Sequence, residues 1–408
     1  MEYIKRELER KLIQMNAFFK VILVTGARQV GKTTMLKHLA EGTERSYVSL
    51  DNIMARELAQ TDPALFFQTY RPPVLIDEVQ HAPGLFEYIK VLCEESEETG
   101  RFWLTGSEQW NMMKHVRESL AGRIGILALH SLSQREKQGI LLEQTLDFTM
   151  EMMQERQKLL PPNNLVDVFE HIWRGGMPQV QEANEEMRQE YFNSYIDTYL
   201  MRDVTELGGV IDYSKFIKLL RACAALTAEQ VNYKTLASAS EISEPTAKEW
   251  VRLLEGLHII FMLPPYANNE LKRLTKTPKL YFYDTGLCAY LSMWLTKETL
   301  MNGAASGHYF ENYVVAELMK SYAYGKVKAN LYYYRDSNAK EIDVFVESDG
   351  MIHPLEIKKA ATPDRREVKK FSLLDKASVP RGRGGIVCMC DKPMPIDEHN
   401  AMIPCNLI

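Results

Sequence analysis

The sequence Gly26-Ala27-Arg28-Gln29-Val30-Gly31-Lys32-Thr33 follows a short apolar run, Val21–Thr25, and precedes a stretch with helical character, Met35–Ala40. It matches the pattern G-x-x-x-x-G-K-[ST] at every fixed position. The glycines let the backbone curl so that successive amide groups point at phosphate oxygens, and the positive end of the next helix adds to this attraction. The stretch therefore predicts a strand, a phosphate-binding loop and a helix.

Two residues at the end of this loop have side chains suited to the chemistry of ATP. The ammonium group of Lys32 would reach the β and γ phosphates, and the hydroxyl group of Thr33 would bind magnesium. We therefore expect ATP and Mg²⁺ as ligands. The residues expected to contact the nucleotide are Gly26, Ala27, Arg28, Gln29, Val30, Gly31, Lys32, Thr33 and Thr34.

A second signal is the apolar run with two acids at its end, Val74-Leu75-Ile76-Asp77-Glu78. Open α/β sheets bind ligands at the carboxyl ends of their strands. Asp77 would hold magnesium there, and Glu78 would act as the general base that polarises the attacking water. The alternative is a solvated strand end. Together with the loop, the two acids favour hydrolysis of ATP over binding alone.

Two further segments offer polar side chains to the γ phosphate. Leu104-Thr105-Gly106-Ser107 resembles the polar sensor position of AAA-type ATPases, with Ser107 as the candidate and Gln109 as a weaker one. An ordinary turn is the alternative. Leu120-Ala121-Gly122-Arg123 would present Arg123 to a phosphate in the same or a neighbouring subunit, unless this arginine is solvated or structural.

Apolar runs and helix-like stretches alternate along the first part of the chain, which is typical of an α/β domain with a mostly parallel sheet. After this part the pattern becomes helical, including one long helix at Glu185–Leu207, and strands return near the end of the chain. The predicted strands are Val21–Thr25, Tyr47–Leu50, Val74–Ile76, Phe102–Thr105, Ile124–Leu129, Leu331–Tyr334, Glu341–Val346, His353–Ile357 and Gly385–Met389, and the first helices are Met35–Ala40, Asn52–Gln60 and Phe86–Cys93.

The amino-acid composition limits the classes of protein to which this chain can belong. The 408 residues are 46% hydrophobic and 25% charged, with a formal net charge of −5, so the chain has a globular balance and no overall basic field for nucleic acid. The six cysteines show no C-x-x-C spacing, which favours reduced thiols in the cytoplasm. Apolar runs stay below the ~18 residues of a membrane helix, and the first residues lack an apolar signal region. We expect a cytoplasmic protein without a membrane partner.

The segment 233–263 has the pattern of a winged helix-turn-helix. Helices are predicted at Tyr233–Ser240 and Thr246–Glu255, with Pro245 in the first turn of the second helix and Ser243 or Glu244 as its cap. A wing strand is predicted at His258–Leu263. The expected core residues are Leu236, Ala237, Ile242, Ala247, Val251 and Leu254.

The charges of this segment leave its role open. The second helix carries more acidic than basic side chains, which is unfavourable for a helix lying among phosphates. Phosphate contacts would then come from the basic residues that follow, Lys272, Arg273, Lys276 and Lys279. The alternative to DNA binding is a packing or partner-binding module.

Asp349-Gly350 predicts a two-residue hairpin turn. This turn places Asp343 opposite Glu356 and Glu341 opposite Lys358, all on one face of the hairpin. Carboxylates on β-carbons ~4.5–5.5 Å apart repel each other, and a divalent metal between them would relieve the repulsion. A solvated face neutralised by Lys358 is the alternative. Pro354 favours an edge strand or a bulge, which would shift this register.

Motifs along nearly the whole chain resemble one family, the AAA-type ATPases of bacteria and archaea whose C-terminal domain is related to PD-(D/E)XK nucleases. The motifs are Gly-Ala-Arg-Gln-Val-Gly-Lys-Thr (26–33), Leu-Ile-Asp-Glu-Val-Gln (75–80), Leu-Thr-Gly-Ser (104–107), Leu-Ala-Gly-Arg (120–123), Gly-Gly-Met-Pro (175–178), Tyr-Leu-Met-Arg-Asp-Val (199–204), Tyr-Asp-Thr-Gly-Leu (283–287) and Phe-Glu-Asn-Tyr-Val-Val (310–315). The resemblance implies an ATPase core at 1–160, a helical lid or linker at 161–212, the winged helix-turn-helix at 213–268 and a nuclease-like α/β domain at 269–408.

The resemblance to the D…E-x-K site of these nucleases also implies roles for single residues. Asp343 and Glu356 would hold a metal, Lys358 would orient or activate the water, and Glu311 on the preceding helix would be an extra acid. The leading hypothesis is an ATPase whose nucleotide-driven motion acts on DNA or a DNA-associated partner. The second is a nucleotide-switched binding protein whose nuclease-like domain only recognises a partner. A homo-oligomer is compatible with both, because AAA-type sites often need a neighbour's arginine.

Overall fold

The computed structural model describes residues 2–106, 116, 118–142, 144–162, 164–208, 211–267, 277–336 and 338–408. The chain forms two compact units. Unit 1 comprises Met1–Leu132 with the short segment Gly256–His258, and unit 2 comprises Ser133–Glu255 with Ile259–Ile408. Each unit is described by itself.

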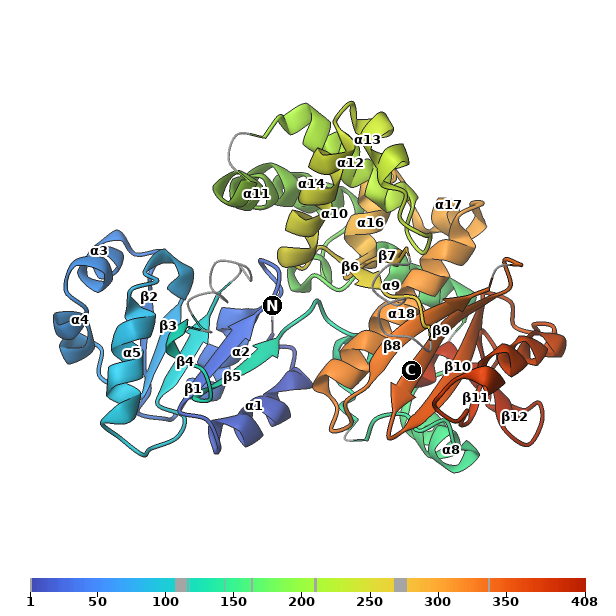
Figure 1. The fold of residues 1–408 in the computed structure, drawn as a ribbon, viewed down its shortest axis with the longest axis horizontal. Helices are drawn as coiled ribbons and strands as arrows, with labels where there is room; N and C mark the ends of the chain where they lie inside the picture. Colours follow the sequence, from blue (N-terminus) through green and yellow to red (C-terminus); the bar gives the residue numbers. More distant parts are fainter. Residues whose placement is uncertain are drawn as a thin grey trace. The chain divides into compact units, whose positions relative to one another are not determined.

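Unit 1 is built on a five-stranded parallel sheet in the order β2-β3-β4-β1-β5 (Figure 1). Its strands are β1 (Val21–Thr25), β2 (Ser46–Ser49), β3 (Val74–Asp77), β4 (Phe102–Thr105) and β5 (Ile124–Ala128). All five predicted strands are confirmed, with ends that differ by one residue at most. The order inserts β4 between β1 and β3, so the strand before the phosphate loop is not the neighbour of the strand that carries Asp77.

Helices α3, α4 and α5 cover one face of this sheet. Alternate residues of β1, β3 and β4 share a single apolar cluster with residues of these helices, among them Phe66 and Phe86. The helices of unit 1 are α1 (Leu8–Asn16), α2 (Lys32–Ala40), α3 (Ile53–Thr61), α4 (Pro63–Thr69) and α5 (Leu85–Glu94). The helix α4 was not predicted; its start is set by Pro63 in the first turn and by Asp62, which accepts a bond from the amide of Leu65.

The first half of unit 2 is mainly helical. The predicted long helix is present from α10 (Glu185–Ser194) to α11 (Met201–Gly208), with the π-helical turn Tyr195–Leu200 between them. The helix-turn-helix segment gives α13 (Tyr233–Ser240) and α14 (Glu244–Gly256). The other elements include α7 (Gln134–Lys137), α8 (Met150–Leu159), α9 (Leu165–Arg174), the 3₁₀ segment η2 (Pro178–Val180), α12 (Tyr213–Ala225), β6 (Ile260–Leu263), β7 (Lys279–Phe282), α16 (Thr285–Leu291) and α17 (Lys297–Asn302).

The second half of unit 2 is a six-stranded sheet in the order β12-β13-β11-β10-β9-β8 (Figure 1). The strands β8, β9 and β10 are antiparallel, whereas β10, β11 and β13 are parallel. The elements are α18 (Ser306–Tyr324), β8 (Asn330–Arg335), β9 (Glu341–Ser348), β10 (Met351–Lys358), the 3₁₀ segment η4 (Arg365–Lys376), β11 (Gly384–Cys388), β12 (Met394–Pro395) and β13 (Asn400–Pro404).

The β9–β10 hairpin has the predicted register, with pairs from Met351↔Ser348 to Leu355↔Val344. The expectation that Pro354 marks an edge strand is wrong, because β10 lies inside the sheet. Pro354 is tolerated there because pairing on its other side is interrupted. On that side, the amide of Gly382 donates to the carbonyl oxygen of Ile352, and the next paired residues are Leu355 and Gly385 of β11. Pro354, which has no amide hydrogen, lies in the gap between these contacts.

Candidate functional site

The phosphate loop of unit 1 depends on two glycines. Gly26 has φ 139°, and a β-carbon there would lie 2.0 Å from the carbonyl oxygen of Leu129. Gly31 has φ 97° and forms the left-handed N-cap of α2. Side chains at either position would be strained, and at Gly26 one would also collide with backbone. The pattern that the sequence showed is therefore required by the geometry of the turn.

The ammonium group of Lys32 lies inside the curl of this loop. The side chain is buried, and Nζ donates to the carbonyl oxygens of Gly26 at 3.0 Å and Ala27 at 2.8 Å. Both bonds keep the charge next to the backbone that would surround a phosphate. Of the other loop residues named from the sequence, Arg28 and Val30 are buried, Gln29 has φ 60° and Thr34 on α2 is exposed.

Asp77 connects the loop helix to the two central strands. Its Oδ1 atom accepts bonds from the hydroxyl groups of Thr33, at 2.6 Å, and Thr105, at 2.5 Å. Its Oδ2 atom accepts a bond from the Tyr47 hydroxyl group at 3.3 Å. These three donors come from α2, β4 and β2, so the carboxylate is held from three sides at the carboxyl edge of the sheet.

Glu78 directly follows β3 in a left-handed conformation with φ 55°. Its amide group donates to the Thr105 hydroxyl oxygen at 2.9 Å, and its carboxylate accepts a bond from the Gln80 side chain. The side chain is half-buried. Because of the sharp turn after Asp77, the two successive side chains point in different directions. The Asp77 carboxylate faces Thr33, and the Glu78 carboxylate faces Gln80 in the turn itself.

Sequence reasoning missed Thr105. Its motif pointed instead to Ser107, which lies outside the described residues together with Gln109. In the structure the fully buried Thr105 hydroxyl group bridges both predicted acids. The signal that could have identified it is a polar residue at the end of an apolar strand, but only the position of β4 between β1 and β3 shows that it faces both acids.

Arg123 lies at the opposite edge of the sheet. It immediately precedes β5, and its carbonyl oxygen accepts a bond from the amide of Val21 at the start of β1. Its guanidinium group pairs with Glu94 at 2.9 Å. The phosphate loop follows the last residue of β1, whereas Arg123 precedes the first residue of the parallel strand β5. The full length of a five-residue strand, about 16 Å, therefore separates Arg123 from the loop. Arg123 therefore does not reach a nucleotide at the loop of its own chain, and the neighbouring-subunit role stays a prediction.

The oxygen donors of Thr33 and Asp77 fit a magnesium ion. Magnesium prefers oxygen ligands and commonly takes one or two from the protein beside those of the phosphates and water. A hydroxyl and a carboxylate oxygen already 2.6 Å apart need only a small separation to share such an ion. The donor chemistry at this edge therefore agrees with the cofactor that the loop pattern predicts.

The acids predicted in the C-terminal sheet also lie close together, but each carboxylate has a cationic partner. Asp343 Oδ2 accepts bonds from the amide of Ile357 at 2.8 Å and from Lys358 at 3.5 Å. Glu356 is fully buried, with Oε2 2.8 Å from Lys370 and Oε1 3.9 Å from Lys358. Burial, and next the charge of Asp343, raise the pKa of Glu356 to about 8.

Glu311 on α18 is neutralised by a lysine that the sequence assigned to another role. Lys279 Nζ lies 2.8 Å from Glu311 and 2.6 Å from Glu341, and the Tyr281 hydroxyl group donates to the same Glu311 oxygen at 2.7 Å. The prediction that Lys279 contacts DNA phosphates is therefore wrong, because its side chain is buried in ion pairs. Lys272, Arg273 and Lys276 lie outside the described residues. Burial, and next the charge of Asp343, raise the pKa of Glu311 to about 7.

These side chains do not converge as metal ligands. Within the described ranges, no group of three or more His, Cys, Asp or Glu side chains is arranged to hold a metal ion. The three acids Asp343, Glu356 and Glu311 are instead bonded to lysine, tyrosine and backbone donors. The arrangement in the sheet does not fit the metal that the nuclease resemblance implies.

The helix-turn-helix segment packs largely as predicted. Ser243 caps α14 by accepting a bond from the amide of Thr246 at 3.2 Å. Of the expected core residues, Leu236, Ala237, Ala247, Val251 and Leu254 are buried, whereas Ile242 is half-buried. Lys248 pairs with Glu244 at 2.8 Å on the exposed side of α14. This exposed ion pair partly compensates one of the two positive charges that the helix would offer to phosphates.

Two of the resembling motifs pack against each other and have a structural role. Gly175 has φ 77°, and a β-carbon there would lie 2.3 Å from the Asp284 carboxylate, which accepts a bond from the amide of Gly176 at 2.7 Å. The fully buried Arg188 donates to the carbonyl oxygens of Trp173 and Gly286. Gly-Gly-Met-Pro and Tyr-Asp-Thr-Gly-Leu therefore form one tight corner of unit 2.

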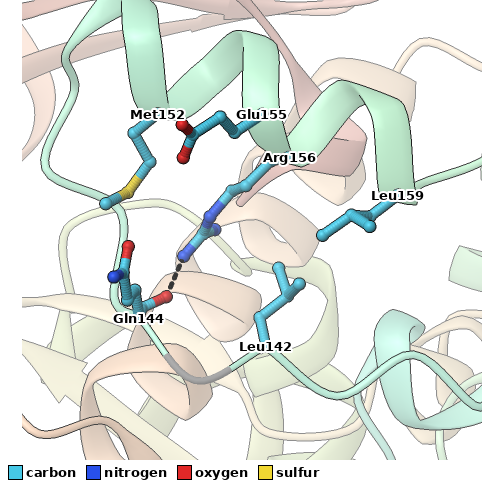
Figure 2. A pocket seen from close by; sticks show the side chains of 6 residues that line it. All are labelled: Leu142, Gln144, Met152, Glu155, Arg156 and Leu159. Atoms are coloured by element: carbon cyan, nitrogen blue, oxygen red, sulfur yellow. Dashed lines mark hydrogen bonds between the residues drawn. The ribbon is translucent and has the colours of Figure 1, made fainter.

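Figure 2 shows a pocket of about 240 Å³ beside α8. The guanidinium group of Arg156 points into this region and donates to the carbonyl oxygen of Gln144 at 2.5 Å. It also donates to the carbonyl oxygen of Leu407 at 2.6 Å. The lining residues are Leu142, Gln144, Met152, Glu155, Arg156 and Leu159, and they include none of the residues predicted for ATP or metal. The pocket is not part of the candidate site.

A parallel sheet, a glycine-dependent loop that wraps a lysine, and an acid at the end of a non-adjacent strand define a P-loop nucleotide-binding domain in unit 1. Comparison with known families agrees. Residues 18–138 match the family described as AAA domain, residues 165–298 match the domain of unknown function DUF8612, and residues 306–408 match the domain of unknown function DUF4143. The chain therefore carries an AAA-type P-loop ATPase domain and a separate, β-rich C-terminal DUF4143 domain.

Similar proteins cover most of the chain. Uncharacterized proteins of Mycobacterium bovis and Mycobacterium tuberculosis are 26% identical to it over 392 residues, which is 95% of this chain and 80% of each relative. An uncharacterized protein of Methanocaldococcus jannaschii is 25% identical over 300 residues, 64% of this chain and 60% of the relative. The alignments with these relatives therefore extend over most of this chain.

Two solved structures align with low scores. The Walker-type ATPase of Pyrococcus abyssi aligns with a TM-score of 0.46 and 14% identity, over 71% of this chain and 96% of that one. The Thermotoga maritima RuvB Holliday junction branch migration motor aligns with a TM-score of 0.31 and 16% identity, over 64% of this chain and 90% of that one. Within the described part of the chain, no helix combines the length and apolarity that crossing a membrane requires.

Proposed function

We propose that the chain binds and hydrolyses ATP at the loop of unit 1 and couples hydrolysis to an action on DNA or a DNA-associated partner. The observation that supports hydrolysis is the chain of bonds from Thr33 through Asp77 and Thr105 to the amide of Glu78. It joins the loop helix to a second acid at the same edge of the sheet, where open α/β sheets bind their ligands.

In this proposal each residue has one task. The loop amides and the Lys32 ammonium group bind the phosphates and hold the γ phosphate in position. A magnesium ion held by Thr33 and Asp77 would neutralise the charge that develops on the phosphate oxygens. Glu78 accepts a proton from the attacking water, and Thr105 fixes the position of the Glu78 backbone. Arg123 would complete a neighbour's site in a homo-oligomer.

The test is ATP turnover by the purified full chain with magnesium. Lys32→Ala should lose nucleotide binding, whereas Glu78→Gln should keep binding and lose turnover by roughly 100-fold or more, because general-base catalysis contributes about 10²–10⁴-fold. Matched controls are Lys37→Ala, an exposed lysine on the same helix, and Glu95→Gln, an exposed acid at the end of α5. Unchanged turnover in Lys32→Ala would contradict the site assignment.

Coupling to DNA rests on the helix-turn-helix elements α13 and α14. Their predicted positions and packing support a recognition module, while the Lys248–Glu244 pair weakens its attraction for phosphate. The measurement is ATP turnover with and without double-stranded DNA, at two salt concentrations. We expect DNA to stimulate turnover more at the lower salt concentration. Turnover that is indifferent to DNA would favour a protein partner.

A second candidate function is favoured by one observation, the lysine partners of Glu311 and Glu356. In this reading the chain is a nucleotide-switched binding protein, and the C-terminal domain recognises a partner without cutting DNA. Plasmid cutting with magnesium separates the candidates, with Lys358→Ala as the site variant. Cutting that depends on Lys358 would exclude the second candidate, and the absence of cutting in both proteins would support it.

A further inference from the structure

The charged cluster of the C-terminal sheet holds a buried cation of its own. Lys279 is only 3% exposed, and its ammonium group lies 2.8 Å from Glu311 Oε1 and 2.6 Å from Glu341 Oε1. The Tyr333 ring is 5.7 Å from the same nitrogen. A buried ammonium group is costly unless it is paired and hydrogen-bonded, so these partners specify where Lys279 sits.

The other carboxylates of the cluster are neutralised in the same way. Lys370 from η4 lies 2.8 Å from Glu356, and Lys358 lies 3.5 Å from Asp343. The second oxygen of Glu341 is 3.4 Å from Arg335. Each of the four carboxylates that face this region therefore has an ammonium or guanidinium partner, and Lys370 is shared with a further acid, Glu367, at 2.6 Å.

Lys279 enters the cluster from a different part of unit 2. It begins β7, which pairs with β6, the strand that follows the helix-turn-helix segment. Backbone hydrogen bonds also join the residues after β6 to β8 of the sheet. The amide of Tyr266 donates to the carbonyl oxygen of Tyr333 at 2.8 Å, and the amide of Tyr333 donates to the carbonyl oxygen of Pro264 at 3.1 Å. The ammonium group thus belongs to a paired strand and is buried, and not carried by an exposed surface side chain.

We propose that Lys279 is a resident cation that takes the place of a divalent metal in this carboxylate cluster and joins the β6–β7 hairpin to the C-terminal sheet. Glu311 and Glu341 bind the ammonium group, and a divalent ion beside it would meet like charge at close range. Of the acids that the nuclease resemblance assigns to a metal, Glu311 is the one that contacts this ammonium group in the described ion pairs. This inference does not depend on ATP hydrolysis by unit 1.

Because Lys279 would occupy the metal position, its removal should create affinity for a divalent metal at this cluster. The charge of Lys279 is removed in Lys279→Met, which keeps most of the length of the side chain and leaves Glu311, Glu341 and Asp343 facing each other. Oxygen ligands in such a group suit Mn²⁺, which is a paramagnetic probe for magnesium-type sites. Lys340→Met, an exposed lysine next to Glu341, is the matched control.

The experiment measures Mn²⁺ binding to the full chain by electron paramagnetic resonance, without nucleotide. Every protein carries Asp77→Asn, so that the proposed magnesium site of unit 1 does not contribute. We expect at most weak Mn²⁺ binding by the parent and by Lys340→Met, and binding at least tenfold tighter by Lys279→Met. Adding Glu311→Gln to Lys279→Met should abolish that gain. Circular dichroism confirms that each variant is folded.

Two results would overturn the proposal. One is Mn²⁺ binding by the parent that is lost in Glu356→Gln or Asp343→Asn, because the cluster would then hold a metal with Lys279 in place. This first result can be obtained with a folded parent protein even if Lys279→Met does not fold. The other is a folded Lys279→Met protein that binds no more Mn²⁺ than the parent, which would show that Lys279 does not occupy a metal position. ATP turnover of the chain with Asp77 intact tests the proposed function separately.

Discussion

Replacing Thr105 with valine tests the arrangement of the two acids of unit 1 most directly. Valine has nearly the shape of threonine but lacks the hydroxyl group that donates to Asp77 at 2.5 Å and accepts from the amide of Glu78 at 2.9 Å. Thr105 is fully buried, so water does not replace these bonds easily. The variant therefore removes one contact of each acid and leaves both carboxylates in the chain.

The size of the effect follows from the two bonds. Leaving a buried amide without an acceptor costs about 1–3 kcal/mol, and a hydrogen bond to a charged group is worth about 1.5–3 kcal/mol. Because one hydroxyl group makes both bonds, we expect a local loss of about 2–4 kcal/mol. Hydrogen exchange of peptides from β3 and β4 should become roughly 30- to 1,000-fold faster, since about 1.4 kcal/mol corresponds to a factor of ten.

The same variant should slow catalysis without weakening ATP binding in proportion. The Thr105 hydroxyl group bonds Asp77 and the amide of Glu78, so its role is to position these two residues. We expect kcat to fall roughly 10- to 100-fold, about 1.4–2.7 kcal/mol of transition-state stabilisation, while KM for ATP changes less. Steady-state ATP turnover at several ATP concentrations separates the two constants.

Thr105→Ser is the matched control, because serine keeps the hydroxyl group and loses only a methyl group. It should retain the hydrogen-exchange pattern and most of the turnover. Equal behaviour of Thr105→Val and Thr105→Ser in both measurements would refute this role of the hydroxyl group. A variant that loses protection but keeps kcat would show that the bonds stabilise the sheet without orienting Glu78.

Three further variants test separate parts of the structure. Gly26→Ala should reduce ATP affinity at least tenfold in equilibrium dialysis, because its β-carbon would lie 2.0 Å from the Leu129 oxygen; normal affinity would contradict the strained loop. Ser243→Ala should destabilise α14 by about 1 kcal/mol, seen as faster exchange of its amides, because the cap on Thr246 is lost; unchanged exchange would contradict the capping role. The pKa of Glu356 is raised from the ordinary value of 4.5 to about 8 in the folded chain, so the folded chain binds this proton more tightly than the unfolded chain does. The resulting stabilisation is complete below pH 4.5 and is lost as the pH rises toward and through 8. Thermal unfolding between pH 5 and pH 9 should therefore show a steeper loss of stability for the wild type than for Glu356→Gln, by up to about 1.4 kcal/mol per pH unit, and equal slopes would disprove the burial of that charge.

The sequence by itself determined the elements of unit 1 and the residues of its loop. Five apolar runs became strands with nearly the predicted ends, and the pattern from Gly26 to Thr33 formed the predicted turn. These features are local, because a short apolar run, two obligatory glycines and a following helix restrict the backbone without help from distant residues. The β9–β10 register was predictable for the same reason, since Asp349-Gly350 fixes which residues face each other.

Tertiary structure decided what those residues contact. The position of β4 between β1 and β3 selects Thr105 as the bridge between the two acids, and strand order is a property of the whole sheet. The sequence leaves open how far Arg123 lies from the loop, and the parallel pairing of β5 with β1 places it at the opposite end of these strands. Long-range pairing also reassigned Lys279, which follows a basic stretch in sequence yet is buried between Glu311 and Glu341. The physical reason is that a lysine's charge is equally satisfied by a phosphate or by two carboxylates, and only the packing of β7 against α18 determines which of them it meets.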